Sequence, residues 1–349
     1  MPSYFVTVCG GFETVCEEEI AERLPGVRNM WHVYGRVFFD YDGPPSDVLK
    51  LRSVNRCYAY VAELKNVPPQ RHALEQMREW IAGLSLDEAV ALSLRARGVE
   101  LCDVPSFRVT AQRGGEHEYR SPEIASYLGA GVVQRYGWPV DLEGYDIEVK
   151  AHLSDDWLVV GVSLTDYSLH RRDRLRSGHA ALKASVAHCL IRIAAPQAGE
   201  LLLDPMCGSG TIPIEAALSW ENLRVVGGDV DPEALARAQD NVAYTQARVT
   251  LVRWDARRLP LPSATVDVIV SNFPWGRRSG SHRANRALYP PVLKEVARVL
   301  RPGGRAVVLT LEKRLTEGVV AQIDRLSIRS ARGVSVSNLR PSVYELQKR

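Results

Sequence analysis

Short apolar runs alternate with helical patterns throughout the second half of the chain, and this alternation constrains the fold more than any other feature. Strands are expected at the apolar runs, which span residues 199–205, 223–230, 248–255, 265–272 and 305–312. Such strands, separated by helices, are typical of a parallel sheet covered on both faces. The second half is therefore predicted to be a doubly wound, Rossmann-like α/β domain, with residues 328–347 forming an antiparallel hairpin at the sheet edge.

The first half of the chain is less regular and predicts an α+β region. A strand, a helix and a strand are expected at 4–10, 12–24 and 36–41, and residues 106–137 predict a strand, a loop and a helix. Ser121 is expected to cap that helix, with Pro122 at its first position. The expected domains span residues 1–65, 66–165 and 181–349, with a basic linker at 166–180.

Composition narrows the class of protein. The 349 residues contain no apolar run of about 18 that would span a membrane. The N-terminus lacks the pattern of a secretion signal. The six cysteines are scattered without the spacing of metal ligands. We therefore expect a cytoplasmic protein that binds no metal and has no disulfide framework.

Charge is distributed unevenly along the chain. Residues 1–165 carry 16 Lys and Arg against 24 Asp and Glu, a net charge of −8, whereas residues 166–349 carry 28 against 17, a net charge of +11. The second half is thus the better candidate for contact with a polyanion.

A glycine-rich turn follows the first expected strand of the second half. Glycines at such a turn let the backbone approach a ligand at a helix N-terminus, and a dinucleotide is the usual ligand in this fold. Asp204 at the strand end would repel a pyrophosphate but attract an ammonium group, which favours S-adenosylmethionine over NAD. Cys207 has no activating neighbour and is interpreted as a small packed residue. The candidate cofactor-binding residues of the turn are Asp204, Met206, Cys207, Gly208, Ser209, Gly210 and Thr211.

Acidic residues also end the next two expected strands. Asp229, followed by Val230, is placed to accept hydrogen bonds from ribose hydroxyls, and Asp255, followed by Ala256, to accept from an adenine amino group. One such aspartate would be interpreted as a helix cap. Three at successive strand ends, after a glycine turn, predict a methyltransferase core.

The stretch SNFPWG (271–276) follows the fourth expected strand and predicts the catalytic loop. The side-chain oxygen of Asn272 and the carbonyl of Phe273 can each accept one N–H of an exocyclic amine, which orients a weak nucleophile. Pro274 restricts the turn, and Trp275 offers a ring on which a flipped base can stack. Asn272 is also expected to border the cofactor.

These stretches resemble the THUMP-domain family of RNA guanine-N2-methyltransferases over essentially the whole chain. FRVTAQRGGEHEYRSPEIASYLG and DIEVKAHLSDDWLVVGVSL resemble a THUMP module, and HAALKASVAHCLIRIA resembles the helix before the family's DPxCGSGTI turn. The resemblance implies a class I methyltransferase domain, a ferredoxin-like domain at 1–65 and a THUMP domain at 66–165. It further implies tRNA as partner and guanine N2 near position 6 of the acceptor stem as target. RRDRLR (171–176) departs from the R-x-Y-R-like element that is common in this family's linker.

Arginines supply the candidate RNA contacts. A THUMP module on an acidic half requires a local basic patch or recognition through RNA shape. Arg135, Arg283 and Arg286 are secondary candidates. The main candidates are Arg108, Arg113, Arg120, Arg171, Arg172, Arg277 and Arg278.

Other interpretations stay open at this stage. The loop allows guanine N2 at tRNA position 10 or in rRNA or snRNA, and it allows adenine N6. A catalytically inactive RNA-binding scaffold is the alternative from another class, although the intact cofactor motif argues against it. The sequence decides neither the number of methyl groups added, nor the oligomeric state, nor the need for a small activator subunit.

Overall fold

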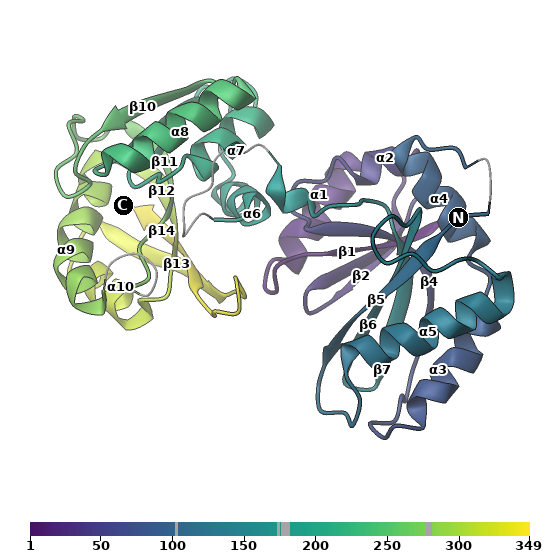
Figure 1. The fold of residues 1–349 in the computed structure, drawn as a ribbon. Coiled ribbons are helices and arrows are strands. Elements are labelled where there is room, and N and C mark those ends of the chain that lie inside the picture. Colours follow the sequence, from purple (N-terminus) through teal and green to yellow (C-terminus); the bar gives the residue numbers. More distant parts are fainter. Residues whose placement is uncertain (102–103, 173–174, 176–181, 277–280) are drawn as a thin grey trace. The chain divides into compact units, whose positions relative to one another are not determined.

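The chain forms two compact units, each built on its own sheet (Figure 1). The computed structural model describes residues 1–101, 104–172, 175, 182–276 and 281–349. The first unit comprises Met1–Thr7 and Glu17–Leu169, and the second comprises Val8–Cys16 and His170–Arg349. A short segment near the N-terminus therefore belongs to the second unit.

The first unit contains a seven-stranded sheet. Its strand order is β2 (Arg28–Val33), β3 (Arg36–Asp40), β1 (Ser3–Thr7), β4 (Arg56–Leu64), β7 (Trp157–Ser163), β6 (Ile147–Ser154) and β5 (Phe107–Gly114). Because β4 pairs with β7, with Tyr58 opposite Ser163, the sheet continues across the boundary expected at residue 65. The division into ferredoxin-like and THUMP domains therefore falls within one sheet.

The helices of the first half differ in detail from the sequence expectation. α5 (Ser121–Tyr136) begins at Ser121 itself, so Arg120 takes the N-cap position that was expected for Ser121. The Glu123 carboxylate accepts the Arg120 backbone N–H at 2.9 Å and satisfies that end of the helix. The sequence also predicts α1 (Glu13–Arg23). It does not predict the three remaining helices of this half, which are α2 (Pro45–Val48), α3 (Ala73–Ala82) and α4 (Asp87–Arg97).

The second unit confirms the doubly wound α/β fold. Its strand order is β10 (Val249–Arg253), β9 (Arg224–Asp229), β8 (Leu201–Asp204), β11 (Val266–Asn272), β12 (Leu300–Thr310), β14 (Ser342–Lys348) and β13 (Leu326–Gly333). The first five strands are parallel, and the terminal hairpin pairs antiparallel to β12 through β14. The chain order reverses between β8 and β11, and ligands bind beyond the carboxyl ends of the strands at such a point.

Helices pack against this sheet and bury its apolar strands. In Figure 1, α9 and α10 lie on the other side of the sheet from α6 and α7. The stretch YPPVLKEVARVL (289–300) predicts a helix, but α9 begins earlier, at His282, and contains Pro290 and Pro291. The helices are α6 (Ala184–Ala194), α7 (Thr211–Ser219), α8 (Pro232–Thr245), α9 (His282–Val299) and α10 (Lys313–Val320). Within the described part of the chain, every helix is too short or too polar to span a bilayer.

Candidate functional site

The glycine-rich turn joins β8 to α7 at the reversal point. Gly208 has φ +56° with open space where a Cβ would stand, so its backbone is accessible to a ligand. Gly210, at φ +83°, instead faces Ala238 of α8, whose Cβ would lie 3.3 Å from an added Cβ. The two glycines therefore differ: Gly208 allows access to the backbone, whereas Gly210 allows the turn to pack on a neighbouring helix.

Asp204 is buried beneath this turn, with only 1% of its surface exposed. Its carboxyl group accepts a hydrogen bond from the Ser271 hydroxyl at 2.7 Å and one from the Met206 backbone N–H at 3.2 Å. Burial, with a smaller contribution from the nearby Asp229 carboxylate, raises the pKa of Asp204 to about 7, although the hydrogen bonds from Ser271 and Met206 oppose this rise. A positively charged ligand at this position would stabilise the ionised form. The position of Ser271 at the strand end was the only sequence signal for this partner.

Asp229 ties the end of β9 to the glycine turn. Its carboxylate accepts the Gly208 N–H at 2.8 Å and the Asp231 N–H at 3.0 Å. Asp231 in turn caps α8 by accepting the Glu233 N–H at 2.9 Å. Asp229 thus orders the turn, and its remaining acceptor capacity faces the cavity described below.

The glycine pair before Asp229 has a packing role that the sequence did not reveal. A Cβ on Gly228 would stand 2.1 Å from the ring of Trp254, so only glycine leaves room for that indole. The Trp254 Nε1–H donates to the Pro205 carbonyl at 3.0 Å, at the start of the glycine-rich turn. Three strand ends are therefore linked by one buried tryptophan.

Asp255 forms an ion pair with Arg257, two residues further along the chain. The Arg257 guanidinium contacts both carboxylate oxygens, with Nε at 3.0 and 2.9 Å, and lowers the pKa of Asp255. Both side chains are partly exposed. A ligand amino group at Asp255 would therefore share the carboxylate with Arg257.

The loop after β11 is held by hydrogen bonds on both sides of Pro274. The Trp275 Nε1–H donates to the Asn272 side-chain oxygen at 3.0 Å, which orients the amide. The Pro274 carbonyl accepts from the Tyr289 hydroxyl at 2.7 Å and from the Asn285 amide at 2.9 Å. No described residue donates to the Phe273 carbonyl. The loop thus leaves that carbonyl, and one lone pair on the Asn272 oxygen, available for a ligand.

The supports of this loop lie on α9 and β12. Tyr289 also hydrogen-bonds the Thr310 hydroxyl at 2.7 Å, and the Phe273 ring packs edge-to-face on Tyr289 with centroids 5.2 Å apart. The Phe273 side chain is fully buried, so only its backbone can contact a substrate. The helical spacing of Asn285 and Tyr289, one turn apart, was the available signal for these supports.

One cavity of about 760 Å³ collects the predicted residues, a size within the usual range of small-molecule sites. Gly210 is the only predicted cofactor residue that does not line it. Burial raises the pKa of Cys207, which fits a packed residue rather than a nucleophile. The predicted residues that line the cavity are Asp204, Met206, Cys207, Gly208, Ser209, Thr211, Asp229, Val230, Asp255, Ala256, Asn272, Phe273, Pro274 and Trp275.

The candidate RNA-binding arginines fall into three groups. Arg108 pairs with Glu148 at 3.0 Å and stacks on Tyr145, and Arg172 pairs with the buried Glu215 at 3.3 Å. These contacts give both arginines structural roles. Arg277 and Arg278 lie outside the described residues.

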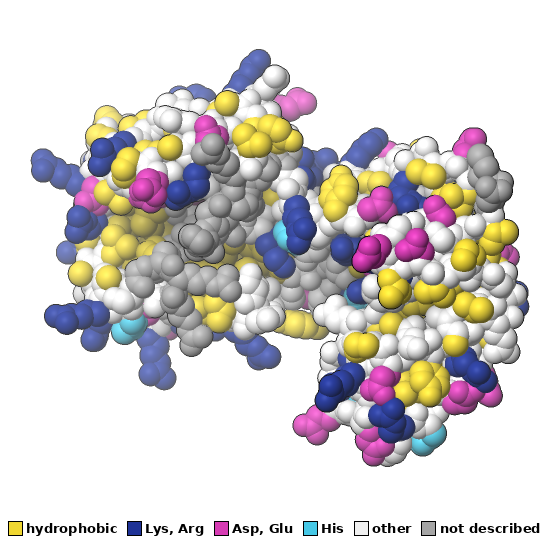
Figure 2. Space-filling view, viewed as in Figure 1, with side chains coloured by type: hydrophobic (Ala, Val, Ile, Leu, Met, Phe, Trp, Pro, Cys, Tyr) yellow, Lys and Arg dark blue, Asp and Glu magenta, His cyan; other side chains and the backbone are white. Residues whose placement is uncertain are grey.

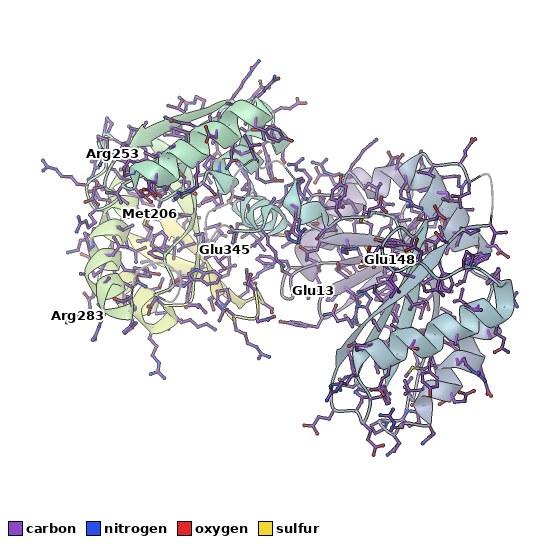
Figure 3. All side chains as sticks on the ribbon, viewed as in Figure 1. Glu13, Glu148, Met206, Arg253, Arg283 and Glu345 are labelled. Carbon is purple, nitrogen blue, oxygen red and sulfur yellow. The ribbon has the colours of Figure 1, made fainter. Side chains whose placement is uncertain are left out.

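The third group stays available for contact with a polyanion. Figure 3 shows Arg283 pointing away from the second unit, and Figure 2 shows Lys and Arg side chains along that unit's outer edge. Arg113 is partly exposed although it hydrogen-bonds the Gly115 carbonyl at 2.7 Å. Arg120, Arg171, Arg283 and Arg286 are exposed.

Known proteins match both parts of the chain. A THUMP domain model matches residues 94–163, and an RMKL-like methyltransferase domain model matches residues 171–341. A Bos taurus protein named tRNA (guanine(6)-N(2))-methyltransferase THUMP3 is 36% identical over 70% of this chain and 52% of its own length. The chain thus spans about half the length of this mammalian relative.

Bacterial proteins match over a larger share of their length. A Thermus thermophilus protein named tRNA (guanine(6)-N2)-methyltransferase is 35% identical over 71% of this chain and 74% of its own length. The crystal structure of TrmN from Thermus thermophilus covers 100% of both chains with a TM-score of 0.82 and 29% identity. These matches extend over both units of the chain.

Proposed function

Because the chain belongs to the THUMP-domain methyltransferase family, whose cofactor is S-adenosylmethionine, we propose that it methylates the exocyclic N2 of a guanine in tRNA. The target guanine lies near position 6 of the acceptor stem, and the product is N2-methylguanosine. The Thermus thermophilus and Bos taurus relatives carry names for this reaction. We also propose that the protein acts in the cytoplasm, as its scattered cysteines suggest.

One observation carries the proposal: the oriented Asn272 amide shares a cavity with the Asp204 and Asp229 carboxylates. The two acids offer sites for a ligand ammonium group and for ribose hydroxyls. The amide offers an acceptor for a target amine in the same cavity. This distribution fits a positively charged nucleoside cofactor beside an amino group.

The residues of the loop orient a poor nucleophile. When bound, S-adenosylmethionine supplies a methyl group on a positively charged sulfur. The Asn272 side-chain oxygen and the Phe273 carbonyl each accept one N–H of the target amine, which directs its lone pair away from the ring. The alkylated nitrogen is acidic and releases its proton to water, so no side chain is required as a general base. Trp275 supplies a stacking surface for the flipped base.

The first unit serves as the RNA-binding part in this proposal. A THUMP domain model matches within it, and it presents Arg113 and Arg120 among its solvent-accessible cations. Arg171, Arg277 and Arg278 from the linker and the catalytic loop complete the proposed phosphate contacts.

The product of the reaction tests this proposal. Unmodified tRNA incubated with the full chain and labelled S-adenosylmethionine is expected to yield labelled N2-methylguanosine after digestion, located at the acceptor stem. A tRNA with adenine in place of the guanine at position 6 serves as the control and should stay unlabelled. Recovery of N6-methyladenosine, or of no labelled nucleoside from tRNA, rRNA or snRNA, would reject the proposal.

Asp204 predicts a pH dependence of cofactor binding. Its folded-state pKa, raised to about 7 by burial, lies above its ordinary value of 3.8, so the free folded protein retains a proton that the unfolded chain loses. The contribution of Asp204 to stability therefore falls as pH rises from 3.8 to about 7. An ammonium group binds the ionised form of the Asp204 carboxyl group more strongly than the protonated form. The affinity for S-adenosylmethionine should therefore rise with pH up to about 7. Below pH 7, binding should release a proton from Asp204.

Calorimetry at pH 6 and pH 8, in buffers that differ in ionisation enthalpy, measures this proton release directly. Asp204→Asn should bind more weakly and lose the pH dependence. Equal affinity and no proton release at both pH values would place the ammonium group away from Asp204.

A further inference from the structure

The turn between β13 and β14 is the least expected wall of the cavity. Val336 and Leu339 exchange two backbone hydrogen bonds of 2.9 and 3.0 Å, which closes a tight two-residue loop. Ser337 and Asn338 in that loop have φ values of 50° and 63°, as a type I′ turn requires. The turn is thus a defined structure, and Val336, Ser337 and Leu339 line the cavity.

Sheet register places this turn on the acceptor side of the cavity. Ser342, which follows the turn, pairs with Thr310 at the carboxyl end of β12, and the neighbouring Leu309 pairs with Asn272. The carboxylates of Asp229 and Asp255 lie at β9 and after β10, on the opposite side of β8. The turn therefore lies on the same side of β8 as the catalytic loop, and β8, β11 and β12 separate it from β9, which carries Asp229.

From this placement we infer that the β13–β14 turn forms the outer wall of the target-base pocket, an inference that rests on the proposed function. Val336 is buried, Leu339 is half-buried, and both present apolar atoms that suit the face of a planar base. Ser337 is exposed and places a hydroxyl group at the rim, where it can hydrogen-bond the edge of the base. Leu339 thus holds the face of the base in the pocket.

A glycine pair near the N-terminus anchors the turn. The Ser335 N–H donates to the Gly10 carbonyl at 2.7 Å, and Gly11 has φ +91°. A Cβ on Gly11 would stand 2.5 Å from the Gly333 carbonyl oxygen and 3.0 Å from Val334. Both segments belong to the second unit, so Gly10 and Gly11 act as positioning residues for the pocket wall.

Replacement of Leu339 tests the wall. Leu339→Ala in the full chain should lower kcat/KM for tRNA about tenfold or more, because the base is held less firmly against the loop, while affinity for S-adenosylhomocysteine stays within about twofold. Ile328→Ala is the matched control, since Ile328 is a 37% exposed apolar residue of the same hairpin outside the cavity. Unchanged kcat/KM in Leu339→Ala, or an equal loss in Ile328→Ala, would contradict the inference that the β13–β14 turn forms a wall of the target-base pocket.

Replacement of Gly11 tests the anchor, with a readout that needs no activity. Gly11→Ala should speed hydrogen–deuterium exchange at residues 334–341 about tenfold and lower kcat/KM for tRNA, again with little change in cofactor affinity. Gly26→Ala is the matched control, because Gly26 has a similar φ of +84° but open space around its Cβ position. Unchanged exchange at these residues in Gly11→Ala would contradict the inference that Gly11 positions the turn, whether or not the wild-type chain methylates tRNA.

Discussion

Asn272→Ala is expected to lower kcat for tRNA methylation by about 10²–10³-fold, the loss seen when one oriented hydrogen-bonding group is removed from a reacting centre. The side-chain oxygen that would accept an amine N–H disappears, whereas the backbone of the loop keeps its supports at Tyr289 and Asn285. Cofactor affinity should stay within about threefold, because the acids that would hold the cofactor lie on other strands. Single-turnover kinetics with saturating cofactor measures the chemical step.

Trp275→Phe separates the two functions of this loop. The variant keeps an aromatic ring for stacking but removes the Nε1–H that orients the Asn272 amide. We expect an intermediate loss in kcat with a smaller change in KM for tRNA. If Asn272→Ala retained the wild-type kcat, the amide would have no part in orienting the amine, and the Phe273 carbonyl alone would carry that role.

Asp229→Ala is expected to weaken S-adenosylmethionine binding about ten- to a hundredfold. A charge-assisted hydrogen bond contributes about 1.5–3 kcal/mol, and each 1.4 kcal/mol is a factor of ten in affinity. The variant would also release the Gly208 N–H, which Asp229 holds at 2.8 Å, so the turn itself would lose order. Calorimetric titration of the full chain with S-adenosylmethionine measures the change.

Glu233→Ala provides the matched control for charge. Glu233 lies in the first turn of α8, close to Asp229 in sequence, but it does not line the cavity. Its removal should leave cofactor affinity within about twofold, because an exposed charge is screened by water and salt. If both variants bound S-adenosylmethionine equally weakly, Asp229 would act through long-range electrostatics and not through a direct contact.

The location of the site could be predicted because it depends on local patterns. Apolar runs define β8, β9 and β11, and Asp204, Asp229 and Asn272 follow from their positions at strand ends. Parallel strands bring their carboxyl ends to one edge of the sheet, so residues far apart in sequence meet without further information. The pattern at 289–300 predicts only the later part of α9, which begins at His282.

By itself, therefore, the sequence determined the α/β fold, the glycine turn and the position of the candidate catalytic loop, because each depends on residues close together in the chain. Only the tertiary structure decided which groups hold them: Ser271 on Asp204, Trp254 in the space left by Gly228, and Tyr289 on the Pro274 carbonyl. It also gave Arg172 a buried partner in Glu215 and brought Gly11 beside the turn that lines the cavity. These pairs are separated by 15 to more than 300 residues, and no local pattern encodes contacts that form only when distant elements pack.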